Sequence, residues 1–195
     1  GLTWRYGDDA DSRLEAVGTA GEVREWAINQ VSDKFSNHIA YTWVDDQVTG
    51  ESLPGEIRWT GDASGAGARF RIVFGYEARP AEDQGQLHRW GATWQRLQRL
   101  QVIRYEFDGG SGFGLVHRYT LTYTTGNGTG SGRSQLASIE QCGPTECLPP
   151  TSFGWQTGVT GFESAVAGPT DPLAGDAVFA DHDGDDGHVQ QGHLA

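Results

Sequence analysis

Large apolar side chains alternate with polar ones through most of this 195-residue chain. The clearest run holds Phe70, Ile72, Phe74 and Tyr76, with charged residues such as Arg71 between them. A period of two is typical of strands that bury one face, because successive side chains of a strand point to opposite sides of the sheet. The same alternation recurs at 39–43, 57–59, 103–107 and 119–123. It predicts a sheet stabilised by cross-strand contacts between aromatic rings.

Glycine-rich clusters separate these segments and predict tight turns. The sequence contains 29 glycines, many of them within 61–67, 108–112 and 125–132, where they favour surface hairpins. The prediction for residues 1–157 is therefore an all-β domain, mostly an antiparallel sheet of short strands and glycine-rich hairpins. Residues 158–195 are rich in Gly, Asp and small side chains, and we expect an irregular acidic tail there.

The charge balance argues against two classes of partner. The chain has 14 Lys and Arg against 26 Asp and Glu, a formal net charge of −12. Nucleic acids and anionic membrane surfaces require clustered basic residues, so we expect neither as a partner. No apolar run approaches the ~20 residues of a spanning helix, so we expect no membrane segment in this chain. The chain begins without Met or a signal peptide, which indicates a fragment of a longer polypeptide.

The two cysteines, Cys142 and Cys147, lie in the last strand-and-turn unit. A strand over 136–141 that turns back through Gly143 and Pro144 would bring the two sulfurs within bonding range. A structural disulfide is the favoured interpretation. A zinc site needs about four ligands, and a thioredoxin-type pair has two intervening residues, so neither pattern is present. A reactive pair and two reduced cysteines without a role are the alternatives.

Six phrases of the sequence, taken in order, resemble the SpvB and Tc-toxin B-component family, which is related to Rhs/YD-repeat shell proteins. They include Glu-Ile-Arg-Trp-Thr-Gly at 56–61 and Cys-Leu-Pro-Pro-Thr at 147–151. The full set covers 23–33, 36–43, 53–61, 74–80, 118–123 and 133–155. One departure is 35–37, Phe-Ser-Asn, where the family usually has a Gly-Asn pair, so we expect that turn to be built differently.

This resemblance implies a non-enzymatic scaffold, part of a shell or platform that encloses or presents an effector domain of a bacterial toxin complex. The implied partners are other domains or subunits of that complex, and the implied location is secreted. The resemblance also implies an extended segment over 90–100. The spacing of Trp94, Leu97 and Leu100 would alternatively allow a short helical turn there.

The tail contains a candidate calcium site. In the resembling proteins an FG-GAP-like propeller follows this position, and Asp181, Asp183 and Asp185 resemble the start of one of its loops. Alternate carboxylates around a glycine bend at Gly184 let several oxygens converge on one calcium ion. Asp186 replaces the next expected glycine, and a later completing carboxylate is missing. The alternative is a solvated acidic tail.

No catalytic set emerges from the histidines or the paired acids. The histidines at 38, 88 and 117 stand alone, and those at 182, 188 and 193 match no HExxH-type helix. The acid pairs 8–9, 45–46 and 82–83 lie in predicted turns, and adjacent residues do not face one another as the carboxylates of a glycosidase do. We therefore predict no catalytic residue and no certain cofactor.

The tryptophans support an alternative function. Indole rings exposed on a sheet can stack on sugars, which would make the chain an extracellular carbohydrate-binding or adhesion module. Trp4, Trp90 and Trp94 are the candidates because they border polar, glycine-rich stretches. The competing interpretation is that these rings pack in a core or against a neighbouring domain.

Overall fold

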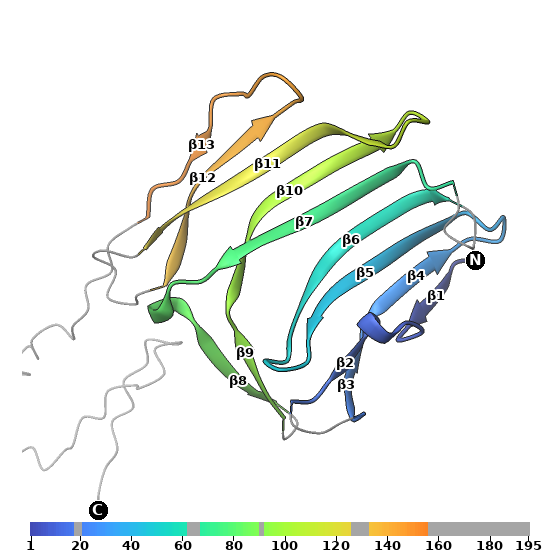
Figure 1. The fold of residues 1–195 in the computed structure, drawn as a ribbon, viewed down its shortest axis with the longest axis horizontal. Coiled ribbons are helices and arrows are strands. Elements are labelled where there is room, and N and C mark those ends of the chain that lie inside the picture. The colour runs from blue at the N-terminus through green and yellow to red at the C-terminus, as the bar shows by residue number, and fades with distance from the viewer. Residues whose placement is uncertain (18–20, 62–66, 90–91, 126–132, 156–195) are drawn as a thin grey trace, which may run out of the picture. The chain divides into compact units, whose positions relative to one another are not determined.

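The computed structural model describes residues 1–17, 21–61, 67–89, 92–125 and 133–155 (Figure 1). Within them the chain is all-β, as predicted. Two short 3₁₀ helices, Ala10–Ser12 and Ala81–Asp83, accompany the strands. The strands are β1 (Thr3–Tyr6), β2 (Arg13–Glu15), β3 (Val23–Trp26), β4 (Ile28–Ser32), β5 (His38–Asp46), β6 (Glu51–Gly61), β7 (Phe70–Ala78), β8 (Gly85–Arg89), β9 (Ala92–Arg96), β10 (Gln98–Asp108), β11 (Phe113–Thr125), β12 (Ser134–Cys142) and β13 (Thr151–Ser152).

Nine of these strands form one antiparallel sheet in the order β1-β4-β5-β6-β7-β10-β11-β12-β13. The two remaining pairs, β2-β3 and β8-β9, are separate hairpins. The hairpin β8-β9 is inserted between β7 and β10, which are themselves neighbours in the sheet (Figure 1). The central strands β5, β6, β7, β10, β11 and β12 run 9 to 13 residues, longer than the short strands the sequence indicates. Of the segment 90–100, residues 92–96 lie in β9 and residues 98–100 lie in β10, so the strand interpretation is confirmed for these residues.

The strand register places the alternating aromatic residues on one face of the sheet. Trp59 pairs with Phe70, and Phe70 pairs with Phe107 on the other side of β7. Tyr105 pairs with His117 in the same way. Because the side chains alternate, the charged residues between these rings lie on the opposite face.

Few apolar side chains are fully buried in the described residues. Leu14, Ala27, Val31 and Cys142 are the buried apolar residues there. The rings of the central strands are only half-buried, and large apolar groups such as Trp26 and Phe35 are exposed. The sheet is therefore held together by its ladders and by contacts across each face.

Two turns illustrate how local sequence fixes the hairpins. At the β10–β11 turn, Asp108 Oδ1 accepts hydrogen bonds from the backbone N–H groups of Gly110 and Gly112, at 2.7 and 3.0 Å. At the β4–β5 turn, Asp33 Oδ1 accepts from Phe35 N at 2.8 Å, and Ser36 has a φ of 68°. The turn at 35–37 is thus closed by an aspartate side chain and by a serine in the left-handed backbone conformation.

No helix in the described part of the chain is long and apolar enough to cross a membrane.

Candidate functional site

The turn between β5 and β6 lies beside Val17, which follows β2, and beside Trp94 of β9. Gly50, in the turn between β5 and β6, has a φ of +71°. A side chain at this position would collide with Val17 Cγ2 and Trp94 Cβ, so glycine allows the turn to pack against β9. Gln95 N donates to Thr49 O at 2.8 Å and links the same two elements.

Glu51 anchors this corner from β6. Its side chain is buried, with 6% of the residue exposed. Glu51 Oε1 accepts hydrogen bonds from the backbone N–H groups of Leu97 and Gln98, at 2.9 and 3.0 Å. A single carboxylate therefore holds the junction where β9 continues into β10.

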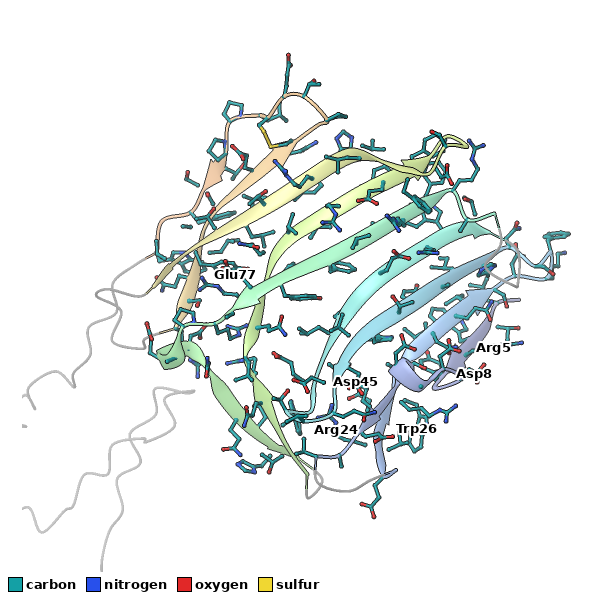
Figure 2. All side chains as sticks on the ribbon, viewed as in Figure 1. Arg5, Asp8, Arg24, Trp26, Asp45 and Glu77 are labelled. Atoms are coloured by element: carbon teal, nitrogen blue, oxygen red, sulfur yellow. A yellow bond between two sulfur atoms is a disulfide. The ribbon has the colours of Figure 1, made fainter. Side chains whose placement is uncertain are left out.

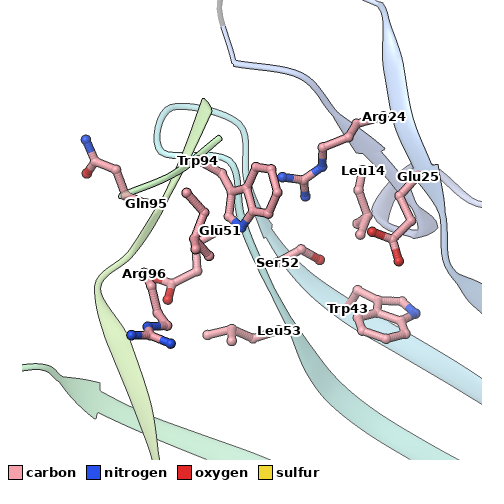
Figure 3. Close-up of a pocket in the computed structure, with 11 residues that line it drawn as sticks. Leu14, Arg24, Glu25, Trp43, Glu51, Ser52, Leu53, Trp94, Gln95 and Arg96 are labelled. Carbon is pink, nitrogen blue, oxygen red and sulfur yellow. The ribbon is translucent and has the colours of Figure 1, made fainter. Parts of the chain in front are cut away.

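A cavity of about 270 Å³ lies between these elements, and we call it the corner cavity (Figure 3). Its walls come from β2, β3, β5, β6, β8 and β9. The apolar part of the wall consists of Leu14, Trp43, Leu53, Leu87 and Trp94.

Polar side chains form the rest of the cavity wall, and three of them contain a buried atom without a partner. Arg24 Nε, Ser52 Oγ and Arg96 Nε are buried atoms that have no hydrogen-bond partner among the described atoms. The Arg24 guanidinium lies 4.5 Å from the centre of the Trp94 ring, and its Nη2 donates to Gly50 O at 3.4 Å. Figure 3 shows Arg24, Glu25 and Ser52 around the same hollow. These three atoms are covered by neighbouring protein atoms, so a guest in the cavity would contact the remaining polar atoms of the lining side chains.

Asp45 and Asp46, the last two residues of β5, have pKa values shifted in opposite directions. The sequence placed this pair in a turn, which is wrong, because both residues lie within the strand. Burial raises the pKa of the Asp45 carboxyl, and the nearby Arg24 charge opposes that shift (Figure 2). Hydrogen bonds from Thr49 Oγ1, at 2.8 Å, and from Val48 N, at 2.9 Å, lower the pKa of Asp46.

We expect Asp45→Asn to raise Tm at pH 7 and Asp46→Asn to lower it. The folded pKa of Asp45 lies above its unfolded value, so the wild type loses stability as pH rises between the two, and neutral Asn avoids that loss. The folded pKa of Asp46 lies below its unfolded value, so its carboxylate contributes stability that is lost as pH falls through the folded pKa. Thermal unfolding followed by circular dichroism at pH 7 and near pH 3 measures both. The difference in Tm between each variant and the wild type should shrink at the lower pH. If both variants changed Tm in the same direction at pH 7, the opposite pKa shifts of Asp45 and Asp46 would be contradicted.

A second cluster, the charged network, covers the face of β6, β7 and β10 opposite the rings. Its members are Glu56, Arg58, Arg71, Arg104 and Glu106. Arg71 is central, with Nη1 3.2 Å from Glu56 Oε2 and Nη2 2.6 Å from Glu106 Oε2. Arg58 pairs with Glu56, and Arg104 Nε lies 3.1 Å from Glu106 Oε1. Each of the two carboxylates is thus held by two arginines, and the network has a structural role.

The aromatic row is the third feature, formed by Trp59, Phe70, Tyr105, Phe107 and His117 across β6, β7, β10 and β11. Ring centres of Trp59 and Phe70 lie 5.8 Å apart, those of Phe70 and Tyr105 6.1 Å, and those of Tyr105 and His117 6.3 Å. The planes of these three pairs are within 17° of parallel. A row of stacked, half-buried rings is a broad apolar surface and lacks the shape of a pocket.

The other sequence candidates have separate places. Cys142 and Cys147 form a disulfide, with Cys142 buried at the end of β12. Glu140 Oε2 lies 3.6 Å from Cys142 Sγ, but two disulfide sulfurs offer no thiolate to a metal. Trp4 is exposed on the edge strand β1, and Trp94 lines the corner cavity.

The histidines of the described part lie far apart in the strand order. His38 is buried in β5, and His117 stacks on Tyr105 in β11. His88 in β8 shares a hydrogen bond of 2.9 Å with Thr93 Oγ1. The candidate calcium ligands Asp181, Asp183 and Asp185 lie outside the described residues, as do Trp90 and the three histidines of the tail. The proposed boundary near residue 157 and the character of 158–195 stay predictions.

Sequence reasoning missed the corner cavity residues other than Trp94. Arg24 lies in the first of the six phrases, whereas Ser52 and Arg96 lie in none, and the three residues are spread over 73 positions of the chain, counting from 24 to 96. Nothing in their spacing indicates that they meet.

Comparisons with known proteins show which solved structures have a similar fold. The chain matches no protein-family model and no curated protein. Among solved structures, it superimposes on the crystal structure of TcdB2-TccC3 with a TM-score of 0.64 and 14% identity over 80% of this chain. It superimposes on the N-terminal domain of effector protein SpvB from Salmonella typhimurium strain LT2 with a TM-score of 0.60 and 16% identity over 73% of this chain. The chain shares their fold.

A Photorhabdus luminescens Tc holotoxin pore gives a TM-score of 0.65 at 14% identity. The chain spans 10% of the TcdB2-TccC3 chain and 58% of the SpvB domain chain. The resemblance to SpvB and Tc toxin proteins that the sequence phrases indicate is confirmed at the level of fold. The FG-GAP part of that prediction, a partial propeller blade over 158–195, lies outside the described residues.

Proposed function

We propose that this chain is a non-enzymatic scaffold domain of a bacterial secreted toxin complex, where it forms part of a shell or platform around an effector domain. The observation that carries the proposal is the aromatic row on a nine-stranded sheet. An apolar sheet face is stable when another layer covers it. We infer that the covering layer comes from other domains or subunits of the complex.

The chemistry of the aromatic row suits a permanent contact. Aromatic side chains are enriched at the centres of protein interfaces, where a few of them supply most of the binding energy. The rings already stack on one another, so little side-chain entropy is lost when a partner docks. The fold similarity adds support, because the TcdB2-TccC3 chain is about ten times longer than the matched region.

The opposite face supports a role without turnover. Its arginines and glutamates pair with one another in the charged network, His88 shares a hydrogen bond with Thr93, and His117 stacks on Tyr105. General acid–base catalysis needs a titratable group within reach of a substrate proton. A secreted location fits the disulfide, since such bonds persist in oxidising surroundings.

Hydroxyl-radical footprinting of the assembled toxin complex tests the proposal. We expect Phe70 and Tyr105 to oxidise at least about fivefold more slowly in the complex than in the isolated chain, while Phe35, 73% exposed in the β4–β5 turn, changes little. As a matched pair of variants, Tyr105→Lys should block assembly and Thr120→Lys, on the opposite face, should permit it. Unchanged oxidation of the rings, or turnover of a glycan or protein by the purified chain, would refute the proposal.

A further inference from the structure

We propose that the corner cavity binds one neutral hexose ring, a role separate from the scaffold function. The proposal rests on three properties of the cavity wall. These are its combination of hydrogen-bond donors and acceptors, its balance of charge and its indole surfaces.

The polar side chains of the wall suit a guest that both donates and accepts hydrogen bonds. The guanidinium groups of Arg24 and Arg96 can only donate, whereas the Glu25 carboxylate can only accept. A sugar hydroxyl does both, so adjacent hydroxyls of one ring can bind arginine and glutamate together. A hydrocarbon guest would displace water from these groups without replacing its hydrogen bonds.

The charges of the wall favour a neutral guest. Two arginines, Arg24 and Arg96, and two glutamates, Glu25 and Glu51, line the cavity, so their formal charges cancel. An anion would be repelled by Glu25, and a cation would be repelled by the Arg24 guanidinium. A neutral polyhydroxyl compound is repelled by neither group and still forms charge-assisted hydrogen bonds with both.

The apolar wall suits the C–H face of a sugar. Trp43 and Trp94 both contribute surface, and Leu14, Leu53 and Leu87 complete it. Mostly apolar walls with a few convergent polar groups are typical of small-molecule sites. The volume of about 270 Å³ lies just below the ~300–1,000 Å³ range of such sites, which limits the guest to about one ring.

The expected affinity is modest. A hexose has about 12 non-hydrogen atoms, and at roughly 0.3 kcal/mol per atom its Kd falls in the millimolar range. The source of the ring is either a free monosaccharide or the terminal residue of a glycan, and the chemistry of the site is the same for both.

Ligand-observed NMR with the full chain tests the site. The probes are glucose, galactose, mannose and N-acetylglucosamine, each also as the terminal and as the internal residue of a trisaccharide. Two variants alter the cavity. Trp94→Ala removes an indole surface. Leu87→Trp enlarges a lining side chain and so narrows the cavity, and folding should tolerate this change because Leu87 is 42% exposed. Trp4→Ala is the control, because it removes an exposed tryptophan on β1.

We expect saturable binding of at least one neutral hexose, weakened about tenfold or more by both cavity variants and unchanged in Trp4→Ala. Stronger binding of the terminal trisaccharide than of the free sugar would identify a glycan end as the source, and equal binding would identify the free sugar. Absence of saturable binding at 50 mM of every neutral probe overturns the proposal. So does binding that survives Leu87→Trp, or binding restricted to acidic sugars such as glucuronate.

Discussion

Replacement of Arg71 by Met should lower the free energy of unfolding by about 3 kcal/mol, the largest loss that we expect from one substitution. The two carboxylates that Arg71 holds have only 14% and 10% of their side chains exposed, on Glu56 and Glu106. Without the central cation, these two carboxylates would repel each other in a poorly solvated environment. Arg58 and Arg104 still hold one carboxylate each, which keeps the loss near the lower end of the range for broken buried pairs.

Urea unfolding followed by tryptophan fluorescence measures this loss. The cation also contributes packing, since the Arg71 guanidinium lies 4.1 Å from the centre of the Phe113 ring, so Met is the replacement that best preserves volume. The matched control is Arg118→Met, which removes an exposed arginine from the neighbouring strand β11 and should cost less than about 0.5 kcal/mol. The double variant of Arg71→Met with Glu106→Gln should regain part of the loss. Equal stability of the Arg71 and Arg118 variants would show that the charged network contributes nothing.

Glu51→Ala should cost roughly 2 to 3 kcal/mol and should loosen the corner of the sheet. Its carboxylate is the acceptor for the backbone N–H groups of both Leu97 and Gln98, and alanine would leave these donors without it. Removing the acceptor from buried donors costs about 1–3 kcal/mol for each donor, and partial access of water reduces the sum. Urea unfolding measures the global loss, and hydrogen exchange measures the local one.

The exchange experiment separates an anchoring role from a general loss of stability. In Glu51→Ala, the amides of Leu97 and Gln98 should exchange faster by a larger factor than amides in the centre of β10. Glu51→Gln retains an oxygen that can accept both bonds and should lose about half as much stability as the alanine variant. Glu25→Ala, at an exposed glutamate of the same corner, should be nearly neutral. Uniformly faster exchange across the sheet in Glu51→Ala would argue against local anchoring.

The sequence predicted the faces of the strands because alternation is a local property. Ile72 and Phe74 lie on the apolar face, and Arg71 lies on the other, as the pattern of β7 indicates. The same pattern gave no sign that the polar face contains buried charge. Glu106 is buried because the register places Arg71 and Arg104 beside it, and a register depends on neighbours that are distant in sequence.

The corner cavity shows even more clearly that the sequence does not reveal which distant residues meet. Leu14, Ser52 and Trp94 line one cavity, although each belongs to a different hairpin or strand pair. Their meeting depends on Gly50, whose lack of a side chain admits Val17 and Trp94 to close contact. The glycine is visible in the sequence, but the residues that approach it are not.

The sequence by itself determined the strand class, the inward faces of the central strands, the hairpin turn at 108–112 and the resemblance to SpvB and Tc toxin proteins. The first three follow from side-chain alternation and from turn preferences, which act between residues close together in the chain, and the resemblance follows from the ordered phrases of the sequence. Tertiary structure alone decided which strands are neighbours, which charges are desolvated and where a cavity forms. The physical reason is that burial and hydrogen-bond satisfaction depend on the packing of distant segments, whose free energy no short window of sequence contains.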